Sequence, residues 1–168
     1  DLLTRVMEGR AQIEARSMVE ARLDDGQSLQ ALNEVFVGHH SHQSARYRLS
    51  WQGQEERQSS SGLIVTTGSG ATGWASSISR ERGSQIQLPA PTEDRLAFFV
   101  REAWPSPATG TELTEGLIQA GESLEVISEM DEGGVVFGDG IEADSLRLVW
   151  GERVQVSLAE STMQLVVG

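Results

Sequence analysis

Short runs of alternating apolar and polar residues, separated by glycine turns, recur along most of this 168-residue chain, which contains 18 glycines. Residues 12–23 alternate in this way and end at Asp24-Asp25-Gly26, a typical hairpin signal, with a return strand expected over residues 29–37. Many short strands at such spacing predict a mainly β fold, a sandwich of antiparallel strands with one or two short helices. The other expected strands cover residues 47–51, 63–66, 96–101, 124–128, 135–137, 146–150, 154–158 and 163–167.

Two segments favour helices instead of strands. The first ten residues place apolar side chains at helical spacing before Gly9, and a short helix is expected over residues 72–79. Residues 84–94 contain prolines and predict a loop or irregular strand. The length suits one domain over residues 1–168. The start lacks a methionine and the features of a signal peptide, and no apolar run approaches a membrane span, so we expect a cytoplasmic piece of a longer protein without a membrane partner.

Charge and composition exclude several chemistries. All 13 basic residues are arginines, against 25 acidic residues, and the net charge is −12. Such a chain repels a phosphate backbone, so nucleic acid is not an expected partner, and the acid excess is interpreted as a solvated surface. The absence of cysteine excludes disulfides, thiolate zinc sites and a cysteine nucleophile. The absence of lysine excludes a Schiff base and a Walker-type phosphate site.

The stretch GLIVTTGSGATGW over residues 62–74 carries a G-x-G-x-x-G pattern. Gly68, Gly70 and Gly73 follow an expected strand and precede an expected helix, where glycine lets a ligand approach the backbone closely. Free N–H groups at the start of a helix suit an anion or a polar ring. A Rossmann unit also needs an acidic residue at the end of a second parallel strand. Glu93 and Asp94 lie near the required distance but follow a proline-rich segment, which argues against a Rossmann unit. A glycine-rich turn without a ligand stays an alternative.

Asn33 and Glu34 form a polar pair inside the otherwise apolar run over residues 29–37. Buried polar groups are costly unless they are hydrogen-bonded, and an amide beside a carboxylate suits the hydroxyls of a ribose. A solvent-facing pair at the end of a strand is the structural alternative.

Three further candidates are weaker. His39, His40 and His42 resemble zinc ligands, but no thiolate or carboxylate spacing completes a site, so a loop near a subunit contact is the preferred interpretation. No G-x-S-x-G nucleophile elbow occurs, which argues against Ser-His-Asp hydrolysis. The four tryptophans suit core positions, and of these only Trp74 lies in a motif.

Taken together, ALNEV and GLIVTTGSGATGW resemble the C-terminal, NAD-binding β-sandwich domain of NAD kinases, whose pattern is an ALNE strand followed by D-G-L-I-V-[ST]-T-P-T-G-S-T-A-Y. Residues 13–19 are similar to the "ERSML" strand of that family, and Phe137-Gly138-Asp139-Gly140 resembles its late V-D-G step. The resemblance spans nearly the whole chain in the right order. It implies that Asn33 and Glu34 bind the NAD ribose.

The resemblance also places the nucleotide-binding turn and marks a divergent branch. By position, Ser69, Thr72, Gly73 and Trp74 fall on that turn, and Ser61 falls where the family has an aspartate that contacts the dinucleotide. Glycine replaces proline at position 68 and alanine at position 73, and tryptophan replaces tyrosine at position 74. These changes keep an aromatic surface but leave the identity of the nucleotide open.

The catalytic G-G-D-G motif of the family does not precede the Asn-Glu pair here. The resemblance therefore implies the substrate-binding, oligomerising half of an ATP-dependent phosphotransferase that makes NADP from NAD. We expect this half to lack catalytic residues and a metal site and to be inactive alone. NAD is the expected ligand, with ATP and Mg²⁺ only beside the N-terminal α/β domain, and a homo-oligomer is the expected assembly. The alternatives are a non-catalytic nucleotide-binding module or a lipid or sugar kinase of the same superfamily.

Overall fold

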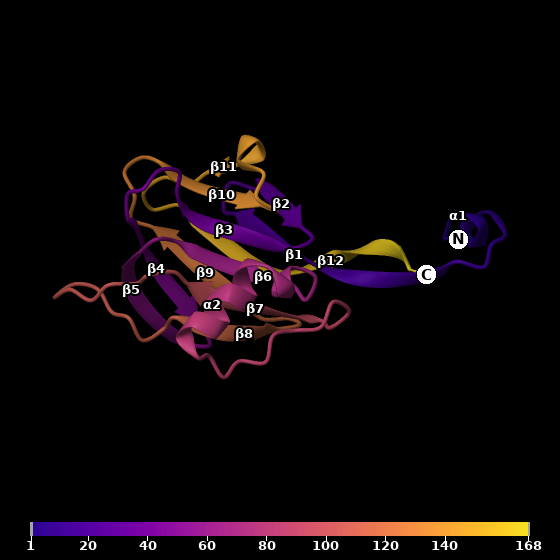
Figure 1. The fold of residues 1–168 in the computed structure, drawn as a ribbon. Helices are drawn as coiled ribbons and strands as arrows, with labels where there is room; N and C mark the ends of the chain where they lie inside the picture. The colour runs from indigo at the N-terminus through magenta and orange to yellow at the C-terminus, as the bar shows by residue number, and fades with distance from the viewer. Residues whose placement is uncertain (1, 168) are drawn as a thin grey trace.

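The computed structural model describes residues 2–167 and arranges their strands in two antiparallel sheets (Figure 1). The prediction of a mainly β fold is therefore confirmed. The first sheet has the order β2 (Ser28–Ala31), β1 (Gln12–Leu23), β12 (Arg153–Val167), β9 (Ser123–Ser128), β4 (Ala45–Trp51), β5 (Gln54–Ser60). The second has the order β11 (Leu146–Arg147), β10 (Gly134–Gly138), β3 (Glu34–His39), β6 (Leu63–Thr66), β7 (Arg95–Val100), β8 (Glu115–Gln119).

The two sheets enclose the main core, and the central strands β6 and β7 of the second sheet are buried on both faces. In β3, Val35 and Val37 point into the core between the sheets, whereas Phe36 joins a smaller cluster on the outer face. Helix α2 (Trp74–Arg82) covers that outer face through its buried residues Ala75 and Ile78. Burial on both faces explains why the central strands of this sheet are nearly continuous apolar runs instead of alternating ones.

The prediction of a single strand over residues 29–37 is wrong. The chain leaves the first sheet after Ala31 and enters the second sheet at Glu34, so Leu32 and Asn33 belong to neither strand. The Asn-Glu pair therefore lies at a crossing between the two sheets instead of inside an apolar strand. The apolar pattern continues through the crossing because residues on both sides of it face the same core.

Other boundaries differ from the expected ones for recognisable reasons. Strand β5 is rich in polar residues and β8 contains Gly116, so neither gave an apolar signal. The two strands expected near the C-terminus are one long strand, β12, and the strand expected over residues 146–150 shrinks to β11. Helices α1 (Leu2–Met7) and α2 occur near their expected places, and the hairpin at residues 24–26 and the irregular segment 84–94 are confirmed.

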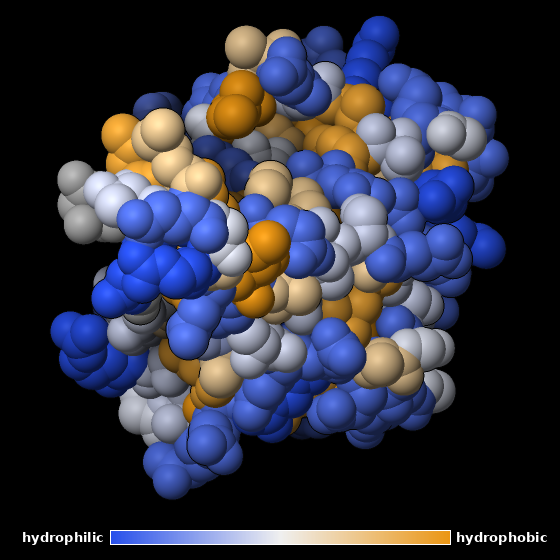
Figure 2. Space-filling model, turned by 90° about the vertical axis from the view of Figure 1, so that its right-hand side faces the viewer, coloured by the Kyte–Doolittle hydropathy of each residue, from blue (hydrophilic) through white to orange (hydrophobic). Residues whose placement is uncertain are grey.

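A two-stranded arm projects from the sandwich, as Figure 1 shows. It consists of the first half of β1 paired with the last part of β12, and α1 lies beyond it. Several large apolar side chains of the arm are exposed, namely Ile13, Met163, Leu165 and Val166. Figure 2, which looks from the arm end, shows apolar surface in separate groups among mostly hydrophilic atoms. Among the described helices, none has both the length and the hydropathy that a membrane span requires.

Candidate functional site

The crossing between β2 and β3 is held by the carboxylate of Asp139. This carboxylate accepts hydrogen bonds from the backbone N–H groups of Leu32, Asn33 and Glu34, at 2.9, 2.6 and 3.3 Å. Asp139 follows β10 and adopts a left-handed backbone with a φ of 51°, a conformation that aspartate tolerates better than most residues. One side chain on a tight turn thus fixes three successive residues that lie more than a hundred positions away in the sequence.

Two threonines at the end of β6 hold the other side of the crossing. The carbonyl of Asn33 accepts hydrogen bonds from the N–H of Thr67 at 2.9 Å and from the hydroxyl of Thr66 at 3.2 Å. The hydroxyl of Thr67 donates to the carbonyl of Leu32 at 2.5 Å and accepts from the N–H groups of Ser69 and Gly70. Residues 32–34 and 66–70, which we call the clasp, therefore form one connected unit together with Asp139.

Two glycines of the fingerprint are required by close approach. A Cβ on Gly70 would lie 2.3 Å from the carbonyl oxygen of Asn33, and a Cβ on Gly68 would lie 2.0 Å from that of Ala90. Gly73 meets no such obstacle, because its nearest neighbour would be 3.4 Å away. Glycine at position 68, where the resembled family has proline, is thus explained by the backbone of the 84–94 segment.

The clasp fixes the backbone of Asn33 and Glu34 but leaves both side chains without a hydrogen bond to any residue in 2–167. Both residues are half-buried. Burial, followed by the nearby negative charge of Asp139, raises the pKa of the Glu34 carboxyl above its ordinary value. An amide and a carboxyl held on a rigid backbone, with their polar atoms unpaired, can bind hydroxyl groups of a ligand.

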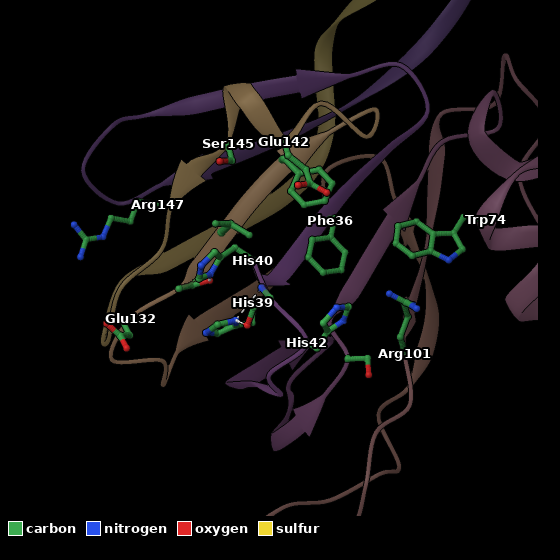
Figure 3. Close-up of a pocket in the computed structure, with 16 residues that line it drawn as sticks. Phe36, His39, His40, His42, Trp74, Arg101, Glu132, Glu142, Ser145 and Arg147 are labelled. Carbon is green, nitrogen blue, oxygen red and sulfur yellow. Dashed lines mark hydrogen bonds between the residues drawn. The ribbon is translucent and has the colours of Figure 1, made fainter.

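An open hollow of about 790 Å³ lies beside the clasp on the outer face of the second sheet (Figure 3). Phe36 forms an aromatic wall with Phe137, at 4.8 Å between ring centroids, and with Trp74, at 6.0 Å and nearly parallel. The guanidinium of Arg101 lies 4.5 Å from the centre of the Trp74 ring. Stacking surface and a cation therefore meet at one end of this hollow.

The predicted site residues fall into two adjoining groups. Ser61 and Trp74 line the hollow, whereas Asn33, Glu34 and Ser69 belong to the clasp. Strand β3 connects the groups, because it contributes Glu34 to the clasp and Phe36 to the hollow. Asp139 of the clasp directly follows β10, which lines the hollow, and Trp74 directly follows the turn that leaves the clasp. Thr72 and Gly73 are exposed between the clasp and α2 and do not line the hollow.

Sequence reasoning assigned no role to the residues that organise both groups. These are Asp139, Thr66 and Thr67 in the clasp and Phe36 and Arg101 in the hollow. Asp139 lies in the step over residues 137–140 that resembles the late V-D-G of the family, but its hydrogen bonds to residues 32–34 depend on the tertiary fold.

The three histidines also lie on the hollow. Nδ1 of His39 accepts a hydrogen bond from the N–H of Ser41 at 3.1 Å, and the His39 and His40 rings are 4.9 Å apart. Burial, and then the neighbouring His40, lower the pKa of His39. Among residues 2–167, no three His, Asp or Glu side chains are arranged so that they could hold a metal ion together.

No protein-family model and no curated protein sequence matches the chain. Among solved structures, it is similar to yeast NADH kinase complexed with NADH, with a TM-score of 0.77 and 16% sequence identity. The match covers 99% of this chain and 48% of the yeast chain, so this chain spans about half the length of that protein. At this identity the similarity establishes an NAD kinase-like fold.

Proposed function

We propose that this chain is the NAD-binding and oligomerising β domain of an ATP-dependent NAD kinase-like phosphotransferase. The observation that carries the proposal is the clasp, which fixes the backbone of Asn33 and Glu34 and leaves their side chains free for a ligand. The clasp stands in a fold like that of a kinase solved with NADH. In this proposal Asn33 and Glu34 bind a ribose of the dinucleotide.

The second part of the site is the turn that leads into α2. Ser69, Thr72 and Gly73 lie along it, and Trp74 and Ser61 reach the hollow, where the aromatic wall offers a surface for a nicotinamide or adenine ring. Ser61 would contact the dinucleotide as a neutral hydroxyl, which is compatible with the pyrophosphate of an anionic ligand.

Binding of NADH to the purified chain, measured by isothermal titration calorimetry, tests this function. Replacing Asn33 with alanine should weaken binding by about 1–3 kcal/mol, because a ligand hydroxyl loses its partner. Gln155→Ala is the matched control, since it removes an exposed amide from β12 on the other sheet. The absence of NADH binding, or equal losses in the two variants, would contradict the proposal.

We further propose that the chain alone does not transfer phosphate. Phosphoryl transfer requires positioned metal ions and phosphates, and the G-G-D-G motif that supplies this in the resembled family does not occur in the 168 residues. Incubation with NAD, ATP and Mg²⁺ should form no NADP, and activity is expected only together with an N-terminal α/β domain. NADP formation by the purified chain would refute this part.

The proposal includes a homo-oligomer and a cytoplasmic protein. Exposed apolar side chains on the arm and on α1, and the partly exposed Trp74, support further contacts with an N-terminal domain or another copy. Light scattering at about 10 μM or above should show an oligomer, and a strictly monomeric species would contradict it.

Two alternatives make different predictions. A non-catalytic nucleotide-binding module would bind NADH but make no NADP even in the full-length protein. A lipid or sugar kinase would not bind NADH at the clasp, and Asn33→Ala would leave any weak affinity unchanged.

A further inference from the structure

Arg101 occupies an unusual position at the edge of the hollow. It follows β7, and its backbone is fixed against the turn before β6, where its N–H donates to the carbonyl of Gly62 at 2.7 Å and its carbonyl accepts from the N–H of Ser61 at 2.8 Å. Its half-buried side chain lies over Trp74, with the guanidinium carbon 4.5 Å from the ring centre. The guanidinium is therefore held at a defined place instead of sampling solvent freely.

No carboxylate neutralises this guanidinium. In the described part of the chain, Arg101 forms no ion pair within 4.0 Å and its side chain donates no hydrogen bond. This holds although Glu81 and Glu102 line an adjoining hollow together with Arg101 and Trp74. Seven other arginines are paired with an acid: Arg10, Arg16, Arg22, Arg48, Arg57, Arg95 and Arg153. In a chain with a net charge of −12, an unpaired and partly buried arginine is conspicuous.

The acids that line the same hollow lie away from Arg101. Figure 3 shows Glu132 at the far end of the hollow and Glu142 beyond Phe36, whereas Arg101 lies next to Trp74 with His42 nearby. The N–H donors of this guanidinium are unused within residues 2–167, and the donor fork of an arginine matches the oxygens of a phosphate. The end of the hollow beside Trp74 thus combines a ring surface with an unpaired donor set for an anion.

We propose that Arg101 is a specificity residue that pairs with a phosphate of a nucleotide whose ring contacts the aromatic wall. The choice of a nucleotide rests on the function proposed above, whereas the preference for a phosphorylated ligand rests on Arg101 and Trp74. The acidic surface disfavours anions in general, so selection for phosphate requires a local cation, and Arg101 supplies it.

Calorimetric titration of the full chain with adenosine and with ADP tests the proposal. Wild type should bind ADP at least about tenfold more tightly than adenosine, the scale of a hydrogen bond between charged groups. Arg101→Gln should bring the two affinities close together while adenosine binding persists. Arg101→Lys keeps the charge but loses the planar guanidinium with its paired donors, so it should retain only part of the preference.

Arg147→Gln is the matched control. Arg147 is exposed, lines the far end of the same hollow and lies away from Trp74, so its loss makes the same change in charge without touching the stack (Figure 3). This control should keep the preference for ADP. Thermal unfolding of each variant verifies that it is folded.

Three results would overturn the role of Arg101: equal affinity of wild type for ADP and adenosine, an unchanged preference in Arg101→Gln, or the same loss in Arg147→Gln. These outcomes are separate from failure of the dinucleotide function. NADH binding that depends on Asn33, with no ADP preference, would refute only the role of Arg101. An ADP preference that depends on Arg101, without NADH binding, would refute only the dinucleotide function.

Discussion

Replacing Asp139 tests whether the clasp depends on one carboxylate. Asp139→Gly keeps the left-handed backbone available, because glycine adopts positive φ freely, and removes only the acceptor. Asp139→Asn also tolerates that backbone and keeps one acceptor oxygen. The two variants therefore separate the loss of the side chain from the loss of its charge.

The expected magnitude follows from three hydrogen bonds at 2.9, 2.6 and 3.3 Å. The three backbone N–H donors belong to half-buried residues, so water can bond to them in part when the carboxylate is removed. Each lost hydrogen bond should therefore cost about 1 kcal/mol of stability. Asp139→Gly should therefore lower the free energy of unfolding by about 3 kcal/mol and Asp139→Asn by about half of that. For a urea m-value of about 2 kcal/mol/M, the glycine variant should unfold at about 1.5 M less urea.

Urea unfolding followed by circular dichroism measures this change, and NADH titration on the same samples measures its effect on the site. Asp144→Asn is the control, because it removes an exposed carboxylate from the same segment. Both Asp139 variants should weaken NADH binding, since residues 32–34 lose their position. The reasoning is refuted if Asp139→Gly unfolds within about 0.5 kcal/mol of wild type, the range of ordinary surface substitutions.

Two further predictions concern Glu34 and Gly68 at the clasp, and a third concerns Glu129, whose carboxylate accepts hydrogen bonds from the guanidiniums of Arg48 and Arg57. Glu34→Gln should stabilise the fold near neutral pH, because the raised pKa of Glu34 means that its charged form opposes folding, and it should weaken NADH binding, because the proposed acceptor for a ribose hydroxyl is changed. The gain in urea midpoint should vanish at acidic pH, where the carboxyl is protonated in both the folded and the unfolded state. An equal gain at both pH values would contradict this explanation. Glu129 should behave in the opposite way: burial raises its pKa, but two arginine guanidiniums outweigh burial and lower it, so its stabilisation is present near neutral pH and is lost as pH falls through the folded pKa. Glu129→Gln should therefore lower the urea midpoint at about pH 7, and this loss should shrink as the pH falls below about 4, the ordinary range of a glutamate, whereas a loss of constant size would show a packing role. Gly68→Ala should destabilise the chain by about 1–3 kcal/mol in urea unfolding, because its Cβ would lie 2.0 Å from the carbonyl oxygen of Ala90; unchanged stability would mean that the 84–94 segment moves away without cost.

The sequence predicted the type of fold because strand periodicity and turn chemistry are local. Apolar alternation marked most strands, and the Asp-Gly step at residues 25–26 marked a hairpin that the structure contains. Strands β5 and β8 were missed because they lack the apolar alternation on which this prediction depends. Periodicity could not show that residues 29–37 cross from one sheet to the other, because both parts face one core.

By itself, the sequence determined the β class of the fold and excluded the chemistry that requires cysteine or lysine. It also contained the two motifs that include Asn33 and the glycine turn. Only the tertiary structure decided that these motifs meet, since the contacts join residues more than thirty positions apart and depend on Asp139 from a third segment. It likewise decided that the guanidinium of Arg101 lies over Trp74 without an acidic partner. Local patterns fix which backbone conformations are favourable, but hydrogen bonds and charges between distant segments exist only after both sheets have packed.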